Sequence, residues 1–259
     1  MKKFLLVLSG FLVLLCNASG QNPAYQAGEK VQYLIHYGVI NAGIASLELQ
    51  KDTFASKEVL HSVFIAKTTG IIDALYKVKD IYESYIDSET QLPLKSIRNV
   101  AEGRYRNYNV VLFDRKTRTD SAVLTSNLTG QHITVQNIHD ILSCFYFFRK
   151  SIMSQNPVLK KGDMITITTW FTDELYPIRL RYIDMDEVRT KVGKIRCYKF
   201  NPVTETGRLF KNEEGATFWF SADKNYLIVK VQFDIFVGSF SVDLSSYEGL
   251  SVPLDIIVK

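Results

Sequence analysis

Cysteine is scarce in this 259-residue sequence, which has only three, and none lies in a C-x-x-C pair. The absence of that spacing excludes the common zinc-binding and thioredoxin-type sites. Cys144 and Cys197 each lie in an apolar stretch, and unpaired cysteine is among the most often buried residue types. The sequence therefore predicts two separate buried thiols, with a disulfide between them as the alternative in an oxidising compartment.

Histidine is also scarce, and its four occurrences are separated in the sequence: His36, His61, His132 and His139. No His-Glu-x-x-His helix, Gly-x-Ser-x-Gly elbow or glycine-rich phosphate loop is present. Catalysis needs a nucleophile with a base, a carboxylate pair or a metal set placed in one cleft. The sequence predicts no catalytic residues, no metal site and no cofactor, with a site assembled only by the fold as the alternative.

Neither sign of charge dominates, because 31 Lys and Arg residues against 27 Asp and Glu residues give a net charge of +4. Removal of Lys2 and Lys3 with an N-terminal signal lowers this charge to +2. A nearly neutral chain does not attract nucleic acid through its overall field. We therefore expect no nucleic-acid partner.

No apolar run in the N-terminal region is long enough to cross a bilayer comfortably, since the run there is Phe4–Leu15. Two lysines precede it and small residues follow, an order typical of a secretory signal peptide. The pattern predicts a signal at 1–20, cleavage after Gly20 and export to the periplasm as residues 21–259, without a transmembrane span. Lipidation of Cys16 is the alternative, disfavoured because leucine rather than a small residue precedes it.

The stretch Gly28–Leu49 predicts a β-hairpin around which the remaining chain is arranged. Its first arm places alternate apolar side chains on one face of a strand: Val31, Tyr33, Ile35 and Tyr37. Gly38, Asn41 and Gly43 follow, the residue types that tolerate a turn or a bulge. An isolated hairpin is only marginally stable, so further strands or a helix must cover its apolar face.

Similar alternation recurs along the chain and predicts a mainly β fold, taken as one domain over residues 21–259. Short helical turns are expected at Gly70–Tyr76. The segments 163–172 and 175–182 are expected to pair as a hairpin around Thr172–Glu174. The other expected strands lie near 59–69, 79–87, 94–101, 104–113, 118–125, 131–136, 188–192, 194–201, 216–221, 227–236 and 239–244.

The segment Asn137–Lys150 departs from this strand-like alternation. Its apolar residues recur at helical spacing, which predicts the principal helix. Asn137 is expected to cap the first turn, and Asp140 to complete a capping box. Arg149 and Lys150 are expected to complement the negative end of the helix dipole. The wide apolar stripe predicts that the helix lies against the concave side of the sheet.

Aromatic side chains are the one positive sign of a binding function. Five of them are candidates to line a concave groove for a lipid or another hydrophobic ligand: Tyr33, Tyr37, Trp170, Trp219 and Phe220. The alternative is that they are ordinary core residues, since aromatics dominate the cores of β proteins. Separately, Asp120-Ser121-Ala122 resembles the O-glycosylation acceptor of some Gram-negative envelopes.

These stretches together carry a resemblance to a known family over most of the chain after residue 20. The matching residues are Gly28-Glu29, Tyr33, Tyr37-Gly38, Ala42-Gly43, Leu92-Pro93, Asp140–Ser143, Tyr146, Arg149, Pro202, Gly207-Arg208, Lys211, Trp219-Phe220 and Val237–Leu244. In these residues the chain resembles domain of unknown function 3108, a family of bacterial exported proteins. The resemblance implies a YmcC-like fold, a long curved antiparallel sheet forming a half-barrel around a helix, and it carries no established activity.

The function that these observations favour is a non-catalytic protein of the cell envelope that binds a hydrophobic or lipid-like ligand on a concave sheet face. Open half-barrels of similar shape hold acyl chains in envelope lipoprotein carriers, an analogy of fold alone. The alternative is an assembly module that binds an envelope protein through exposed edge strands. An enzyme acting on envelope glycan or lipid is the least favoured class.

Overall fold

The computed structural model describes residues 24–203, 215–234 and 239–258. The predicted signal segment 1–20 with Cys16 lies outside these residues, as do five residues of the family resemblance: Gly207, Arg208, Lys211, Val237 and Gly238.

Strands make up most of the described chain. They are β1 (Lys30–Tyr37), β2 (Ile40–Phe54), β3 (Lys57–Thr68), β4 (Lys79–Asp87), β5 (Pro93–Glu102), β6 (Tyr105–Asp114), β7 (Ala122–Ser126), β8 (Gly130–Thr134), β9 (Met164–Ile167), β10 (Trp170–Phe171), β11 (Glu174–Leu175), β12 (Ile178–Thr190), β13 (Gly193–Pro202), β14 (Ala216–Ser221), β15 (Ile228–Asp234), β16 (Ser239–Glu248) and β17 (Ile256–Val258). The helical segments are α1 (Gly70–Leu75), α2 (Ile141–Phe147), a π-helical turn (Phe148–Ile152) and a 3₁₀ turn (Met153–Gln155).

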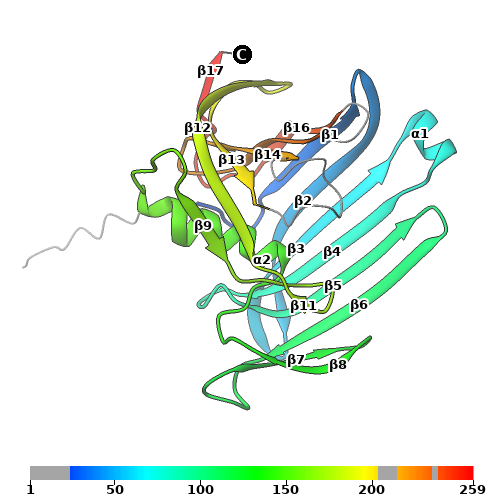
Figure 1. Cartoon of the computed structure of the whole chain (residues 1–259), viewed down its shortest axis with the longest axis vertical. Helices are drawn as coiled ribbons and strands as arrows, with labels where there is room; N and C mark the ends of the chain where they lie inside the picture. Colours follow the sequence, from blue (N-terminus) through cyan, green and yellow to red (C-terminus); the bar gives the residue numbers. More distant parts are fainter. Residues whose placement is uncertain (1–23, 204–214, 235–238, 259) are drawn as a thin grey trace, which may run out of the picture.

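One large antiparallel sheet contains all the strands except the small β10–β11 hairpin. Its order is β8-β7-β6-β5-β4-β3-β2-β1-β16-β15-β14-β13-β12-β9, with β17 added beside β13. Two meanders are therefore joined where the first strand pairs with a late one, for example Tyr33 opposite Leu244. The sheet is curved and not closed, and α2 lies inside its curve between β9 and the first meander (Figure 1). The predicted curved antiparallel sheet on one principal helix is confirmed.

The predicted opening hairpin is confirmed as β1 and β2, which pair from Lys30 opposite Glu48 to Tyr37 opposite Ile40. A register shift after Ile35 accommodates the glycine-containing segment. At Gly43 a Cβ would lie only 2.4 Å from the carbonyl oxygen of Lys67 on β3. Only glycine allows this close approach of two backbones, so Gly43 permits β2 to enter the sheet at that point.

The principal helix begins three residues later than its sequence predicts. Asp140, not Asn137, is the N-cap: its carboxylate accepts from the backbone N–H groups of Leu142 and Ser143. The preceding residues cannot join the helix because their backbone is paired elsewhere. His139 N–H donates to the Thr168 carbonyl, and its own carbonyl accepts from Trp170 N–H. The predicted Asn137 cap is wrong for this tertiary reason.

The segment predicted as one hairpin over residues 163–182 is two separate pairings. β9 pairs with the start of β12, whereas β10 and β11 form a two-residue hairpin of their own. Its turn residues Thr172 and Asp173 both have positive φ, at 53° and 58°. Positive φ at both central residues forms the tight turn of a two-residue hairpin. Asp173 holds this hairpin against β6 and β7 through Asn109 and Ser126.

Arg149 lies in the core instead of facing solvent at the end of the helix. Its guanidinium forms a two-pronged ion pair with Glu29, at 2.5 and 2.8 Å, and both side chains are completely buried. It also donates to the carbonyls of Ala24 and Asn225, each at 2.7 Å. These bonds tie the helical segment to both meanders of the sheet. Arg149 and Lys150 are the basic residues of the last turn, as predicted, but the charge of Arg149 is met chiefly by Glu29.

The apolar core has two main parts. One lies between α2 and the sheet and includes Leu49, Tyr146 and Phe200. The other includes Val31, Leu227 and Leu244 together with Cys197. Cys144 belongs to the first part and Cys197 to the second, and both thiols are free and buried, as their sequence setting predicts.

Candidate ligand-binding cavity

A cavity of about 580 Å³ lies between α2 and the curved sheet. Its walls come from both meanders: β1 to β4 on one side, β12 and β14 to β16 on the other, with α2 between them. Most of its lining is aliphatic or aromatic, and representative side chains are Leu47, Phe64, Phe145, Phe218, Phe220 and Val242. The volume falls within the range of about 300–1,000 Å³ that small-molecule sites occupy.

Strand alternation and the helix together explain why this space stays open. Phe218 and Phe220 lie two residues apart on β14, so both point to the same face, and their rings lie 6.3 Å apart and nearly parallel. From the helical segment, Phe148 packs on Phe220 and on Phe200, with ring centroids 4.6 Å and 5.8 Å apart, respectively. One short helix cannot cover a sheet of this width, so the sheet face beyond Phe148 is left as a cavity wall.

Two charged side chains lie in this otherwise apolar lining, Asp80 on β4 and Arg179 on β12. Asp80 accepts from the backbone N–H of Ala101 at 3.0 Å. Burial, the charge of Asp80 and a hydrogen bond to Asp80 raise the pKa of Glu102, so these two carboxyl groups form a pair. The Nε of Arg179 is buried without a hydrogen-bond partner among the described residues. It is a donor available to a polar group inside the cavity.

The tyrosines of the cavity contribute hydroxyl groups rather than charge. The Tyr33 hydroxyl donates to the Ile228 carbonyl at 3.2 Å, and burial raises the pKa of Tyr33. Burial likewise raises the pKa of Tyr82. Both phenols are therefore neutral at physiological pH. They add hydrogen-bonding capacity to the wall without anionic charge.

The structure brings two of the five predicted ligand-binding residues into this cavity. Tyr33 and Phe220 line it. Tyr37 packs against Phe240 in a tilted arrangement, with ring centroids 5.0 Å apart. Trp219 packs in the second core part, where its indole N–H donates to Asp186 and two lysine ammonium groups lie over its ring. Trp170 lines a different and smaller cavity.

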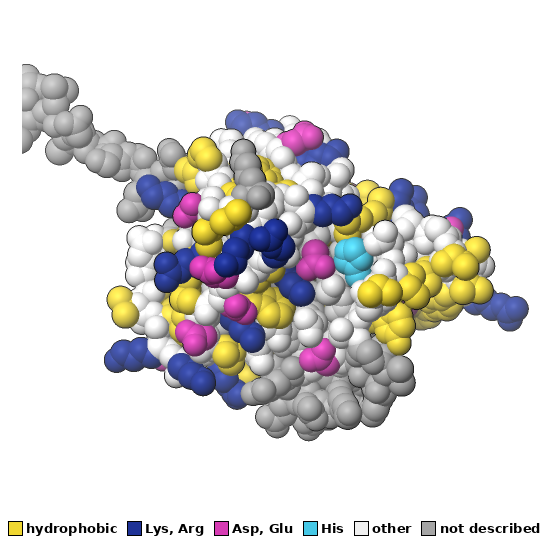
Figure 2. Space-filling model, turned by 90° about the horizontal axis from the view of Figure 1, so that it is seen from above, with side chains coloured by type: hydrophobic (Ala, Val, Ile, Leu, Met, Phe, Trp, Pro, Cys, Tyr) yellow, Lys and Arg dark blue, Asp and Glu magenta, His cyan; other side chains and the backbone are white. Residues whose placement is uncertain are grey.

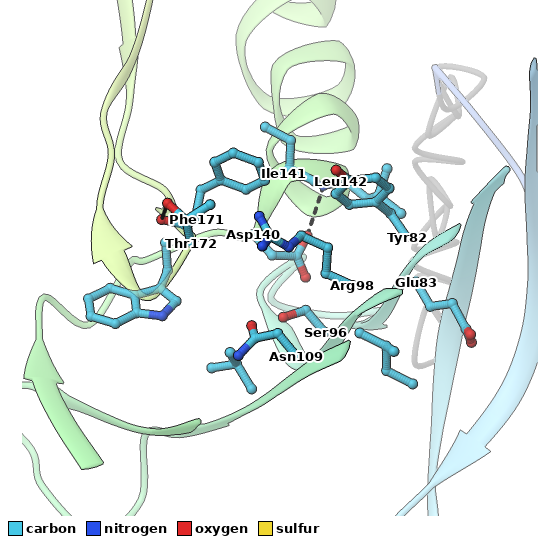
Figure 3. Close-up of a pocket in the computed structure, with 13 residues that line it drawn as sticks. Tyr82, Glu83, Ser96, Arg98, Asn109, Asp140, Ile141, Leu142, Phe171 and Thr172 are labelled. Carbon is cyan, nitrogen blue, oxygen red and sulfur yellow. Dashed lines mark hydrogen bonds between the residues drawn. The ribbon is translucent and has the colours of Figure 1, made fainter. Parts of the chain in front are cut away.

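That smaller cavity measures about 30 Å³ and lies beside the first turn of α2. Figure 3 shows Asp140 and Arg98 close together there, with Phe171 and Thr172 on one side and Tyr82 on the other. Two buried donors in its lining, Arg98 Nε and Trp170 Nε1, have no partner among the described residues. The space suits one or two water molecules bonded to these donors.

The β10–β11 hairpin closes this region from one side. The carboxylate of Asp173 accepts from Asn109 at 3.1 Å and from Ser126 at 2.7 Å. The ring of Phe171 lies beneath the guanidinium of Arg98, 5.4 Å away. These contacts fasten the hairpin across the inner face of β5 to β7.

The histidines contact different sets of side chains. His61 on β3 contacts Glu83 at 2.9 Å and Asp52 at 3.3 Å. His139 is buried beside Ser143, and burial together with the charge of Arg115 lowers its pKa to about 4. In the described part of the chain, no group of three or more His, Cys, Asp and Glu side chains is arranged to hold a metal ion.

The Ser121 hydroxyl of the Asp120-Ser121-Ala122 tripeptide lies beside β7. It accepts from Arg118 at 2.6 Å and donates to Asp120 at 2.9 Å. Within the described residues, no helix is long and apolar enough to span a membrane.

Comparison with known protein families identifies a match. The model of the family described as protein of unknown function (DUF3108) matches residues 32–245. The chain belongs to this family. The match covers β2 to β15 entirely, together with most of β1 and β16, and so includes every wall of the larger cavity. No curated protein sequence is significantly similar to this DUF3108 chain.

Solved structures of similar shape come from several bacteria. A β-barrel-like protein of domain of unknown function DUF1849 from Brucella abortus superposes with a TM-score of 0.57 at 11% identity, over 85% of this chain and 96% of that chain. A DUF1089 family protein from Pseudomonas aeruginosa has a TM-score of 0.39 at 11% identity, over 73% and 89%. A Bacteroides fragilis protein with a YmcC-like fold has a TM-score of 0.37 at 12% identity, over 86% and 97%. The first of these likenesses shows a shared barrel-like fold.

Sequence reasoning missed most of the walls of the larger cavity in this DUF3108 chain. Phe64 and Phe218 carry the same alternating signal as Tyr33, so their strand faces were available from the sequence. Arg179 gave no comparable signal, because it lies in a segment of alternating basic and apolar residues that is typical of a solvated strand face. Arg179 itself is partly exposed, and the burial of its Nε atom without a partner depends on strands that are distant in the sequence.

Proposed function

We propose that this chain is an exported envelope protein that binds a hydrophobic or lipid-like ligand in the cavity between α2 and the sheet, without catalysing a reaction. The observation that carries the proposal is the 580 Å³ apolar cavity, which is built by strands of both meanders. Export is supported by the signal-peptide pattern at the N-terminus, which consists of two lysines, an apolar run and small residues.

The energetics favour a ligand with a long apolar part. Each methylene moved from water into such a lining contributes about 0.8 kcal/mol, so about ten methylenes contribute about 8 kcal/mol before costs. Lost translational and rotational freedom offsets part of that sum. The unpaired Arg179 Nε supplies a donor for a polar group at one point of the wall. An amphiphile with one acyl chain satisfies both features.

The test begins with protein purified from its own host. Native mass spectrometry and organic extraction should recover a bound amphiphile, and the delipidated protein should bind a fluorescent apolar probe. Ala66→Trp places an indole in the cavity, because Ala66 lies on its wall. Displacing about two methylenes of bound ligand would weaken probe binding about tenfold or more.

Ile133→Trp is the matched control, since Ile133 lies on β8 and is 65% exposed. It should leave probe affinity unchanged while adding the same side chain. Recovery of no amphiphile, together with equal probe binding by the Ala66→Trp variant and the wild-type protein, would exclude the carrier function.

Partner binding by strand addition finds less support. A module that recruits partners in this way needs a long, exposed edge strand. The end strands of the main sheet, β8 and β9, contain five and four residues. Short edge strands are a common means of preventing edge-to-edge pairing. Beyond Arg181 the strand β12 pairs, among the described strands, only with β13, and this open part carries the charged residues Asp184, Asp186 and Glu187. Charged side chains on an open edge disfavour strand addition.

A further inference from the structure

Exposed apolar side chains gather at the end of the sheet that carries α1. Ile71 and Leu75 on this helix are 70% and 77% exposed, and Tyr76 directly after it is 54% exposed. Val39 and Ile40, at the turn between β1 and β2, are 100% and 46% exposed. Helix α1 buries none of its own residues, so packing of its apolar side chains does not explain their presence.

Backbone contacts hold these residues at one end of the molecule. The N–H of Thr69, the N-cap of α1, donates to the Ala42 carbonyl on β2 at 3.1 Å. A Cβ at Gly103, in the β5–β6 turn, would lie 2.6 Å from the ring of Tyr76, so that turn lies against the end of α1. Figure 1 places the β1–β2 turn and α1 at the same end of the sheet. In Figure 2 hydrophobic side chains gather at the end that carries α1.

Cations surround this apolar group: Lys67, Lys77, Lys79, Arg104 and Arg106, all exposed. Lys67 and Lys79 are directly opposite each other on β3 and β4, an arrangement that is unfavourable for like charges. Among the described residues, Arg106 donates to the backbone carbonyls of Gly103 and Tyr105 and to no side chain. Within residues 24–203, 215–234 and 239–258, none of the five forms an ion pair.

The nearby carboxylates are already engaged in the fold. Asp73 accepts from the Thr68 hydroxyl at 2.8 Å. Glu102 and Asp80 share a hydrogen bond, and burial is the largest cause of the raised pKa of Glu102. The cations therefore outnumber the acids at this end and have no counterion in the described structure. We call the five cations and the five exposed apolar residues together the docking end.

We propose that the docking end binds the surface of an anionic lipid bilayer. Isolated aliphatic and tyrosine side chains between lysines and arginines match an interface where apolar groups enter the acyl boundary and cations meet lipid phosphates. Long basic side chains also reach headgroups while their methylenes lie along apolar surface. This charge complementarity selects an anionic bilayer over a neutral apolar partner.

The docking end adjoins the larger cavity. Ala66 and Asp80, which line that cavity, immediately neighbour Lys67 and Lys79 in their strands. A bilayer at the docking end would therefore lie beside the β3–β4 wall of the cavity. Binding to the bilayer depends on surface residues alone, so it does not require the cavity to hold a ligand.

Vesicle flotation tests the proposal with the chain lacking residues 1–20. We expect the protein to float with vesicles of equimolar phosphatidylcholine and phosphatidylglycerol, and to bind phosphatidylcholine vesicles much more weakly. Each cation near an anionic surface contributes a factor of about five in affinity, so Lys67→Gln with Lys79→Gln should weaken binding about 25-fold. Ile71→Ser with Leu75→Ser should weaken it as well, because apolar insertion is lost.

The controls carry single substitutions of the same types elsewhere on the molecule. Lys51→Gln, at a lysine that is 68% exposed, and Ile133→Ser on β8 should bind vesicles like the wild type. Ala66→Trp should also keep vesicle binding, which separates this proposal from the ligand function. Equal binding to both vesicle types, or equal loss in control and docking-end variants, would overturn the proposal. Self-association that Leu75→Ser abolishes without any vesicle dependence would overturn it too.

Discussion

The ion pair between Arg149 and Glu29 joins two buried charges, one on the helical segment and one just before β1. The residues are 120 positions apart, and their side chains have 0% and 1% exposure. Burial lowers the pKa of Arg149, but the charge and hydrogen bonds of Glu29, together with two buried tyrosines, raise it, so the net direction is upward. The carbonyls of Ala24 and Asn225 accept further hydrogen bonds from the guanidinium. A buried charge that is paired and hydrogen-bonded in this way is tolerated, whereas an unpaired one is not.

We expect Glu29→Gln to destabilise the fold by about 3–5 kcal/mol, because it leaves the Arg149 charge buried without its counterion. Urea unfolding followed by circular dichroism measures this change. Glu58→Gln removes a surface ion pair with Lys51 and should change stability by at most about 1 kcal/mol. Similar effects of the two substitutions would show that the pair is not a structural anchor.

Arg179 shows how the same residue type takes another role in a different setting. Its Nε is buried without a described partner, beside an apolar cavity. Arg149 fixes the fold because its charge is met within the chain. Arg179 instead lines the cavity where a ligand is proposed to lie, and its Nε–H has no acceptor among the described residues.

The helical segment depends on tertiary contacts at both of its ends. Its start is fixed by Asp140 and Ser143, whose side chains satisfy each other's backbone N–H groups in a capping box. The Asp140 carboxylate also accepts from Ser84 of β4 at 2.5 Å, which binds the cap to the sheet. After Phe147 the helix widens into a π-helical turn, in which the consecutive residues Phe148 and Arg149 are both buried. Such turns change the helical phase and are frequent at functional sites.

Asp140→Ala should cost about 2 kcal/mol or more, since it removes the cap and leaves the Ser84 hydroxyl unpaired. Asn137→Ala, at the exposed residue that the sequence favours as the cap, should change stability by about 0.5 kcal/mol or less. Chemical denaturation measures both values, and hydrogen exchange over residues 141–147 localises the effect. A larger loss in the Asn137 variant would mean that the helix begins earlier in solution.

At the scale of the whole molecule, two meanders become one sheet through the pairing of β1 with β16. The two core parts lie on different portions of this sheet, and each contains one cysteine. Burial raises the pKa of the Cys144 thiol, and burial raises that of Cys197 to about 12. Neither thiol forms a significant amount of thiolate at neutral pH, so both are unreactive until the chain opens.

These thiols test the prediction that residues 21–259 form one domain. In the chain lacking residues 1–20, we expect neither cysteine to react with a thiol reagent in buffer. With increasing urea, both should become reactive at the same midpoint, because one cooperative unit exposes both core parts together. Variants Cys144→Ala and Cys197→Ala identify which thiol reacts. Two clearly separated midpoints would show two independently unfolding units.

The sequence by itself determined the mainly β class, the opening hairpin, the presence of one principal helix and the burial of Cys144 and Cys197. These features depend on local alternation, turn residues and apolar context, which neighbours in the chain express directly. Only the tertiary structure decided that the helix starts at Asp140 and that Glu29 holds Arg149. It also decided that Tyr33 and Phe220, but not Tyr37, line a cavity. Each of these outcomes depends on contacts between segments that are far apart in the chain. A local sequence pattern does not show which side chains such contacts bury, which they pair and which they leave lining a cavity.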